Sequence, residues 1–221
     1  FAFKTSIMYK IKRIIFLTIS FFYLTTDVSA QCLSNGITFG TQADIDNFSS
    51  NYGACTQILG GVTISGADIT NLNGLSNLTY IGGNLIVLNN PQLNNIAGLN
   101  NLQYVGGTLA INNCSALASI SGLNNLNAVG NDFSIDHCSG ITTITGLNGL
   151  QNVGGSFIIE SNVTLSGINA FSNLTTVGHD LKVTSNHSMN LLAGFSHALT
   201  IGNDFTISDT SLSTINGFTG A

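Results

Sequence analysis

The chain has 221 residues, of which 43% are hydrophobic, five are Lys or Arg and ten are Asp or Glu. This composition fits one or two folded domains and excludes a disordered tail. After residue 30 a single cation, Lys182, stands against nine acids, which is a net charge of −8. Such a surface cannot neutralise a phosphate backbone or an anionic membrane, so we predict no nucleic acid partner and no membrane insertion of the mature domain.

Residues 1–30 have the three parts of a secretory signal peptide. From Met8 the chain has a basic start, then the apolar run IIFLTISFFYL, then small residues that end at Ala30. A transmembrane helix needs roughly twenty apolar residues, so the short run favours a signal that is cleaved after Ala30. We therefore expect a secreted or cell-surface protein. Residues 1–7 precede Met8, which indicates that the sequence was cut from a longer reading frame.

The segment 31–58 has the pattern of an N-terminal cap. Thr41 has Asp44 three residues later, a capping-box spacing that begins a short helix. The apolar side chains of this helix fall on one face: Ile45, Phe48 and Tyr52. Cys32 and Cys55 flank the helix, and export permits oxidation, so we expect a disulfide between them. Two free thiols are the alternative.

A repeat of 24 residues organises the solenoid domain that we assign to residues 59–221. A Gly-x-x-apolar-x-apolar motif recurs at this interval and begins at Gly82, Gly106, Gly130, Gly154, Gly178 and Gly202. The first apolar position keeps its type in every repeat: Leu85, Leu109, Phe133, Phe157, Leu181 and Phe205. A fixed period of this kind is typical of a solenoid, in which each repeat stacks on the next.

The spacing inside one repeat predicts strands and turns. Leu85 and Val87 have the period of two that sends both side chains to one face of a strand. The apolar residues that follow are spaced by three, with Asn and Gly between them: Leu93, Ile96, Leu99 and Leu102. We therefore predict an all-β fold, a parallel β-helix of about seven 24-residue rungs with a short N-terminal capping helix and no helix in the repeats. The chain stops inside a rung, so we expect the domain to be truncated at its C-terminus.

Two stretches carry a resemblance to a known family. Residues 55–66 (CTQILGGVTISG) and the apolar and glycine pattern of residues 72–87 resemble the receptor L-domain, and in particular its bacterial secreted relatives. The likeness extends over residues 32–221. The pattern Leu109-x-Ile111-x-x-Cys114 is also similar to the leucine-rich-repeat signature. The resemblance implies a right-handed β-helix and a role in adhesion or in binding an extracellular protein or glycan ligand.

Cys114 and Cys138 are one period apart, in a position that other repeats fill with Asn90, Asn162 and Asn186. A side chain in this position normally points into the turn and hydrogen-bonds to the backbone. We expect two small buried residues in an asparagine ladder. A disulfide is the alternative, because adjacent rungs bring Cα atoms within bonding range.

Asp136 and Glu160 are also one period apart and face outward. Two carboxylates about 5 Å apart suit a retaining glycosidase, which makes a carbohydrate-active enzyme the alternative function. We interpret them as solvated charges and predict no catalytic residue. Another acidic column contains Asp132, Asp180 and Asp204, and oxygen ligands of this kind suit Ca²⁺. These ligands are few, so we predict no metal and no cofactor.

Exposed aromatic and aliphatic side chains indicate a possible ligand face. Tyr80 and Tyr104 stack outward on adjacent rungs, where two turn tyrosines ordinarily pack on each other; the alternative is that they supply contact area for a sugar or peptide. Ile86 and Ile158 are apolar on the outer side of the predicted sheet. We therefore predict a noncatalytic binding or adhesion protein whose ligand face includes Tyr80, Tyr104, Ile86, Ile158, Asp136 and Glu160. A structural spacer within a larger surface protein is a further alternative.

Overall fold

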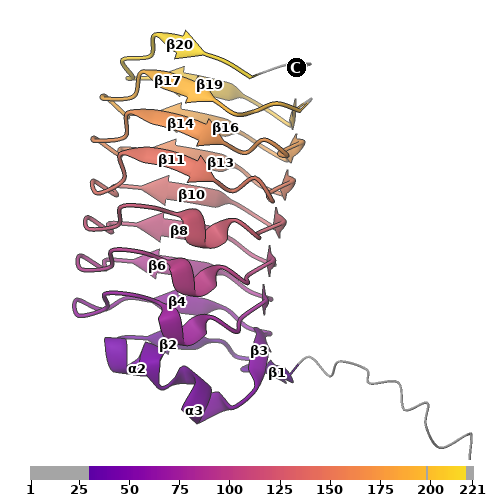
Figure 1. The fold of residues 1–221 in the computed structure, drawn as a ribbon. Helices are drawn as coiled ribbons and strands as arrows, with labels where there is room; N and C mark the ends of the chain where they lie inside the picture. The colour runs from indigo at the N-terminus through magenta and orange to yellow at the C-terminus, as the bar shows by residue number, and fades with distance from the viewer. Residues whose placement is uncertain (1–29, 198, 218–221) are drawn as a thin grey trace, which may run out of the picture.

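The computed structural model describes residues 30–197 and 199–217 as a single coil of stacked turns of chain (Figure 1). The predicted signal peptide, apart from Ala30, lies outside the described residues. Two parallel sheets of eight strands each run the length of the coil. The fold class predicted from the 24-residue period, an all-β parallel solenoid, is confirmed.

The first sheet contains short strands, in the order β1 (Ala30–Cys32), β3 (Cys55–Ile58), β5 (Tyr80–Ile81), β7 (Tyr104–Val105), β9 (Ala128–Val129), β12 (Asn152–Val153), β15 (Thr176–Val177) and β18 (Thr200–Ile201). The second sheet follows the chain from β2 (Ile37–Phe39) through β4 (Val62–Ile64), β6 (Leu85–Leu88), β8 (Leu109–Asn112), β10 (Phe133–Asp136), β13 (Phe157–Glu160) and β16 (Leu181–Thr184) to β19 (Phe205–Ser208). Each coil of chain thus adds one strand to each sheet.

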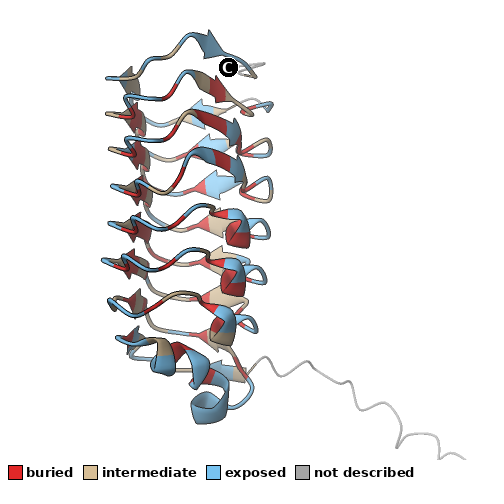
Figure 2. Ribbon diagram, turned by 60° about the vertical axis from the view of Figure 1, so that its left-hand side comes forward, coloured by how far each residue is buried: buried red, intermediate tan, exposed pale blue. Residues whose placement is uncertain are grey.

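Equivalent residues lie directly over one another. The register pairs Leu85 with Leu109, Leu109 with Phe133 and Phe133 with Phe157, as the repeat predicts. These side chains are at most 1% exposed and belong to one continuous core (Figure 2). The rings of Phe133 and Phe157 stack with centroids 4.9 Å apart and planes 12° from parallel. Alternate residues of each strand therefore fill the interior, while the others form a flat outer surface.

The third side of the coil contains helical turns, although the sequence analysis predicts no helix in the repeats. Single turns of 3₁₀ helix occupy it in three consecutive coils: η1 (Asn73–Leu75), η2 (Ala97–Leu99) and η3 (Ser121–Leu123). Their i to i+3 hydrogen bonds include Leu99 N to Ile96 O at 2.9 Å and Leu123 N to Ile120 O at 3.0 Å. A 3₁₀ helix has three residues per turn, so the spacing of three that argues against an α-helix is the period of this tighter one.

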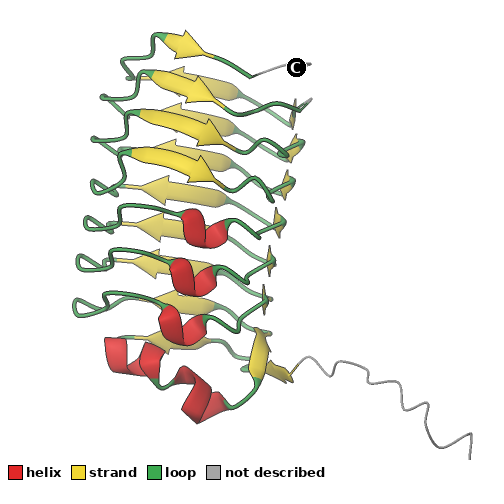
Figure 3. Ribbon diagram, viewed as in Figure 1, coloured by secondary structure: helices red, strands yellow, loops and turns green. Residues whose placement is uncertain are grey.

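Further along the coil the same side becomes a third, four-stranded parallel sheet (Figure 3). Its strands are β11 (Thr143–Gly146), β14 (Gly167–Ala170), β17 (Leu191–Ala193) and β20 (Thr214–Ile215). Ile144 keeps the inward position that Ile120 has in η3, and both are buried. The core therefore continues unchanged while the backbone around it changes from helix to strand.

Two short helices cover the N-terminal end of the core, α2 (Gln42–Asp46) and α3 (Phe48–Tyr52). Thr41 is the N-cap of α2, and its side chain and that of Asp44 complete the capping box predicted from the sequence. Ile45 and Phe48 are buried, whereas Tyr52 is 41% exposed and packs on Phe48 from outside. The segment 31–58 also includes strands β2 and β3, so it belongs to the stacked sheets as well as to the cap.

Candidate functional site

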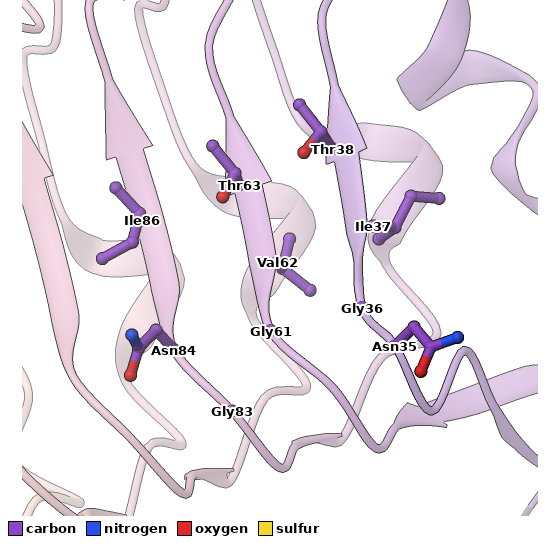
Figure 4. A pocket seen from close by; sticks show the side chains of 10 residues that line it. All are labelled: Asn35, Gly36, Ile37, Thr38, Gly61, Val62, Thr63, Gly83, Asn84 and Ile86. Atoms are coloured by element: carbon purple, nitrogen blue, oxygen red, sulfur yellow. The ribbon is translucent and has the colours of Figure 1, made fainter.

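A groove of about 560 Å³ lies on the outer surface of the second sheet, across the strands nearest the cap (Figure 4). Thr38 of β2, Thr63 of β4 and Ile86 of β6 are paired in register along it. The described lining residues are all uncharged: Asn35, Gly36, Ile37, Thr38, Gly61, Val62, Thr63, Gly83, Asn84 and Ile86. The groove therefore offers hydroxyl, amide, backbone and aliphatic groups to a ligand.

Glycines bring backbone directly against backbone along one edge of the groove. A Cβ on Gly83 would lie 2.6 Å from the N atom of Gly61, and a Cβ on Gly36 would lie 2.3 Å from the O atom of Gly61. Gly36 also has φ +82°, a conformation that disfavours other residues. Asn84 is held next to them because its Oδ1 accepts a hydrogen bond of 2.8 Å from the N–H of Thr108. The groove is thus preformed by packing between coils.

Ile86 lines this groove, but Ile158 lies apart from it. The register places Ala110 and Ser134 between the two isoleucines, so they form no continuous apolar strip. Lys182 follows Ile158 in the same column. Of the two predicted apolar residues, Ile86 therefore lines this groove and Ile158 does not.

Asp136 and Glu160 are register neighbours at the ends of β10 and β13, as the repeat predicts. The Nδ1 atom of His137 lies 2.5 Å from Oδ1 of Asp136, which makes an ion pair when the imidazole is protonated. His137 has φ +52° and an exposed side chain. The pair lies on the outer surface of the second sheet, four and five coils beyond Thr38 in the register, so it is not part of the groove.

The aspartates of the other acidic column hydrogen-bond within the protein. Oδ1 of Asp132 accepts a 2.7 Å bond from the N–H of Ser156, and Oδ2 of Asp180 accepts one of 2.7 Å from Nζ of Lys182. The Lys182 ammonium lowers the pKa of Asp180, and this carboxylate in turn raises the pKa of Lys182. In residues 30–197 and 199–217 no group of three or more His, Cys, Asp and Glu side chains is arranged to hold a metal.

Tyr80 and Tyr104 lie on a different face, the outer surface of the first sheet. They are paired in register, and their rings stack with centroids 5.3 Å apart and planes 12° from parallel. The six residues predicted for one ligand face thus lie on two: the tyrosines on the first sheet, and Ile86, Ile158, Asp136 and Glu160 on the second.

The four cysteines form two different pairs. Cys32 and Cys55 are joined by a disulfide with a Cα–Cα distance of 5.8 Å, which ties β1 to β3. Cys114 and Cys138 are free and buried. The interaction between the two neighbouring thiols lowers the pKa of Cys114 and raises the pKa of Cys138.

The groove residues Asn35, Thr38 and Thr63 do not emerge from the sequence reasoning. Val62 and Ile64 are recognisable as an inward pair, which makes Thr63 an outward residue. The doubled glycines at 60–61 and 82–83 are a second sequence signal for the groove. They lie in adjacent coils, and because glycine has no side chain, the backbone at these positions is accessible to a ligand. The contribution of Asn35 and Thr38 depends on a first coil that lies outside the regular repeat.

Comparison with known proteins gives one family. Residues 54–130 match the family model described as Receptor L domain. No curated protein and no solved structure matches the chain. The matched segment runs from β3 to β9 and includes Tyr80, Tyr104 and Ile86, whereas Asp136 and Glu160 lie beyond it. The family is a ligand-binding, noncatalytic group of extracellular domains. In the part of the chain that the structure describes, no helix has the length and apolar character needed to cross a membrane.

Proposed function

We propose that this chain, whose residues 54–130 are receptor L-domain-like, is a noncatalytic secreted or cell-surface protein that binds an extracellular protein or glycan ligand, with adhesion as its role. The observation that carries the proposal is the neutral groove over β2, β4 and β6. The Cys32–Cys55 disulfide supports an oxidising, extracellular location. The proposal therefore combines a family of binding domains with a preformed concave surface.

The groove suits a ligand that is itself uncharged where it makes contact. Thr38, Thr63, Asn35 and Asn84 offer donors and acceptors, and Ile86 offers an apolar contact. No ionic side chain among the described lining residues is available to pair with a phosphate, a sulfate or an ammonium group. Strand pairing and contacts between coils already order the lining residues. The conformational entropy that the protein loses on binding a ligand is therefore small.

The test is a pair of matched substitutions in one outward column. Thr63→Glu puts a carboxylate into the groove, whereas Thr206→Glu puts it on β19, far along the same column. Binding is measured on panels of extracellular proteins and glycans, and then by titration of each ligand that the wild type captures. Burying a charge against a neutral ligand is costly, so Thr63→Glu is expected to weaken binding at least tenfold and Thr206→Glu to leave it unchanged. Equal affinities of the two variants for the ligand would exclude the groove as the binding site.

The enzyme alternative rests on one observation, the pairing of Asp136 with Glu160 on neighbouring strands. Glycan turnover by the wild type, and its loss in both Asp136→Asn and Glu160→Asn, would favour a glycosidase. We expect no turnover, and we expect both variants to bind as the wild type does.

A further inference from the structure

The stacked tyrosines leave one aromatic face open. Their rings stack along the axis of the coil, so the second face of Tyr104 is directed toward the next strand, β9. The residue in register there is Ala128, whose single methyl group cannot cover a phenol ring. Asn152 follows one coil later. The column therefore places no third ring beside Tyr104 on this side.

The other end of the stack is closed by longer side chains. Gln57 is in register with Tyr80, and its Oε1 accepts a hydrogen bond of 3.5 Å from Nε2 of Gln31. The column from β1 to β12 thus reads Gln, Gln, Tyr, Tyr, Ala, Asn. The gap over Ala128 is consequently the place in this column where a flat ring from outside can continue the stack.

The surroundings of this gap are polar and uncharged. The described strands of the first sheet contain no charged residue. Exposed amides border the gap, with Gln103, Asn127 and Gln151 one coil apart before the three strands. Backbone hydrogen bonds of 2.8 Å, from Asn127 N to Gln103 O and from Gln151 N to Asn127 O, hold these residues in a row. Amides both donate and accept hydrogen bonds, as hydroxyl groups do.

We propose that Tyr104, the space over Ala128 and the bordering amides form a binding site for a neutral pyranose ring. The face of an aromatic ring is negative, and it attracts the partly positive C–H groups on the flat face of a sugar whose hydroxyls are equatorial. The amides of Asn127 and Asn152 take the hydroxyl groups at the sugar's edge. Since the described strands of this face offer no cation, acidic sugars are not selected. The site lies on a different sheet from the groove, and it stands whether or not the groove binds a ligand.

The chain itself provides the optical probe, because it contains five Tyr and no Trp. In the mature chain that we expect after cleavage at Ala30, Tyr52→Phe leaves only the stacked pair to emit. The probes are tetramers of β-1,4-linked glucose and of β-1,4-linked N-acetylglucosamine, with a tetramer of galacturonic acid as the charged comparison. We expect a saturable change in tyrosine emission with at least one neutral tetramer and none with the acidic one.

A substitution that fills the gap tests the geometry without removing the stack. Ala128→Tyr places a third ring where the sugar would lie and is expected to weaken binding at least tenfold. Thr176→Tyr adds the same ring to the same column, beyond Asn152 and out of reach of Tyr104, and is expected to leave the affinity unchanged. Circular dichroism and thermal unfolding establish that both variants fold.

Three results would overturn the proposal: no neutral tetramer alters the emission, the acidic tetramer binds as well as the neutral ones, or Ala128→Tyr binds like the wild type. Thr63→Glu, the groove variant, serves as a further control and is expected to bind the tetramers normally. Loss of tetramer binding in Thr63→Glu but not in Ala128→Tyr would assign the sugar to the groove instead.

Discussion

At the scale of single residues, one position links each coil to its neighbours. It is buried and contains Asn90, Cys114, Cys138, Asn162 and Asn186. Nδ2 of Asn162 donates to the carbonyl oxygens of Ile135 and Glu160 at 3.0 Å, and its Oδ1 accepts a 2.9 Å bond from the N–H of Cys138. The thiol of Cys138 reaches the equivalent carbonyl oxygens, 3.3 Å from Asp136 and 3.6 Å from Ile111. Cysteine can thus take the place of asparagine because its single S–H lies within reach of the equivalent carbonyl oxygens.

The residue before this position adopts a left-handed conformation in consecutive coils. The φ angles of Asn89, Asn113, His137, Ser161 and Ser185 lie between 52° and 57°. This conformation costs a residue other than glycine about 1–2 kcal/mol. The buried hydrogen bonds of the next side chain hold the turn in place and offset that cost.

Asn162 provides a test of this position. Asn162→Leu leaves the N–H of Cys138 buried without a partner and removes the side-chain hydrogen bond to the carbonyl of Ile135, and it is expected to lower the free energy of unfolding by about 3 kcal/mol. Asn162→Cys is expected to cost about 1 kcal/mol, because a thiol serves this position in two natural coils. Denaturant unfolding measures both values. A cysteine variant no more stable than the leucine variant would contradict this account of the position.

Two glycines lie against an Asn or Asp side chain of the preceding coil. A Cβ on Gly155 would lie 2.2 Å from Oδ1 of Asp132, and one on Gly107 would lie 2.1 Å from Oδ1 of Asn84. Thr108 occupies the position of Asn84 and Asp132 in its own coil, and the residue that faces it in the next coil is Asn131 instead of glycine. The dependence is not general, because Asn203 follows Asp180 in the same two columns although Oδ1 of Asp180 accepts a hydrogen bond from the N–H of Asp204.

A double-mutant cycle tests this dependence. Gly155→Ala is expected to destabilise the protein by about 2 kcal/mol, since its methyl group displaces the Asp132 carboxylate from the N–H of Ser156. With Asp132→Ser already present, the same change is expected to cost less, by about 1 kcal/mol. Unfolding free energies of the two single variants and the double variant give the coupling. Strict additivity would show that the clash with backbone, and not with Asp132, requires the glycine.

At the scale of elements, the third side of the coil shows how neighbouring residues select a conformation. Ile120 and Leu123 begin and end a turn of 3₁₀ helix, whereas Ile144 and Leu147, with the same spacing, lie in and after a strand. Ser flanks Ile120, while Thr143 and Thr145 flank Ile144. β-Branched residues favour strands, and pairing with β14 adds hydrogen bonds that a helical turn cannot make.

The N-terminal helix depends on the charge of Asp44. The Thr41 hydroxyl, and then the backbone N–H groups of Gly40 and Thr41, hold the pKa of Asp44 below its ordinary value of 3.8. Both backbone N–H groups donate to Oδ2 at 2.9 Å. The stabilisation is thus fully present above the unfolded pKa and is lost as the pH falls through the lower folded pKa.

Asp44→Asn is therefore expected to lower the thermal midpoint at pH 7, with the difference from the wild type closing as the pH falls from the unfolded pKa through the lower folded pKa. Thermal unfolding at a series of pH values checks this. Asp46→Asn removes one charge from the same helix away from the cap, and it controls for net charge. A difference between wild type and Asp44→Asn that persists undiminished at pH 2 would refute the role of the carboxylate.

At the scale of the whole molecule, stability arises from contacts between adjacent coils. Each coil is too small to bury its apolar residues alone, and stacking covers both sides of a central coil. Leu109, in the middle of its column, is fully buried, whereas Phe205 at the end of the same column is 45% exposed. The charges are also unevenly placed: the described strands of the first sheet have none, while the second sheet carries Asp136, Glu160 and Lys182.

The protection of backbone amides from hydrogen exchange should consequently vary along the coil of this 221-residue chain. Backbone amides of β8 and β10 are expected to exchange with deuterium most slowly, and those of β18 and β19 fastest. Leu109→Ala is expected to cost about 3 kcal/mol, and Phe205→Ala about 1 kcal/mol. Hydrogen exchange and denaturant unfolding measure these values. Equal protection of the central and terminal strands would mean that the coil unfolds in one step.

The repeat predicts most of the fold, because a period of 24 with inward residues two apart specifies strands that stack in register, as the column from Leu85 to Phe157 confirms. The capping box at Thr41 and Asp44 is equally local and was predictable for the same reason. The 3₁₀ turns were missed because a spacing of three was compared with the α-helix alone. The candidate site was predictable only through Ile86, since a groove depends on what adjacent coils place beside it.

The amino-acid sequence by itself thus determined the class of fold, the inward columns, the end covered by helices and the acidic, largely uncharged character of the surface. Tertiary structure decided which outward residues share a face. It separated Tyr80 and Tyr104 from Ile86, placed a neutral groove at the first coils and left Ala128 beside an open ring. The reason is geometric: periodicity specifies whether a side chain points inward or outward, while the bends between sheets decide the face to which an outward side chain belongs.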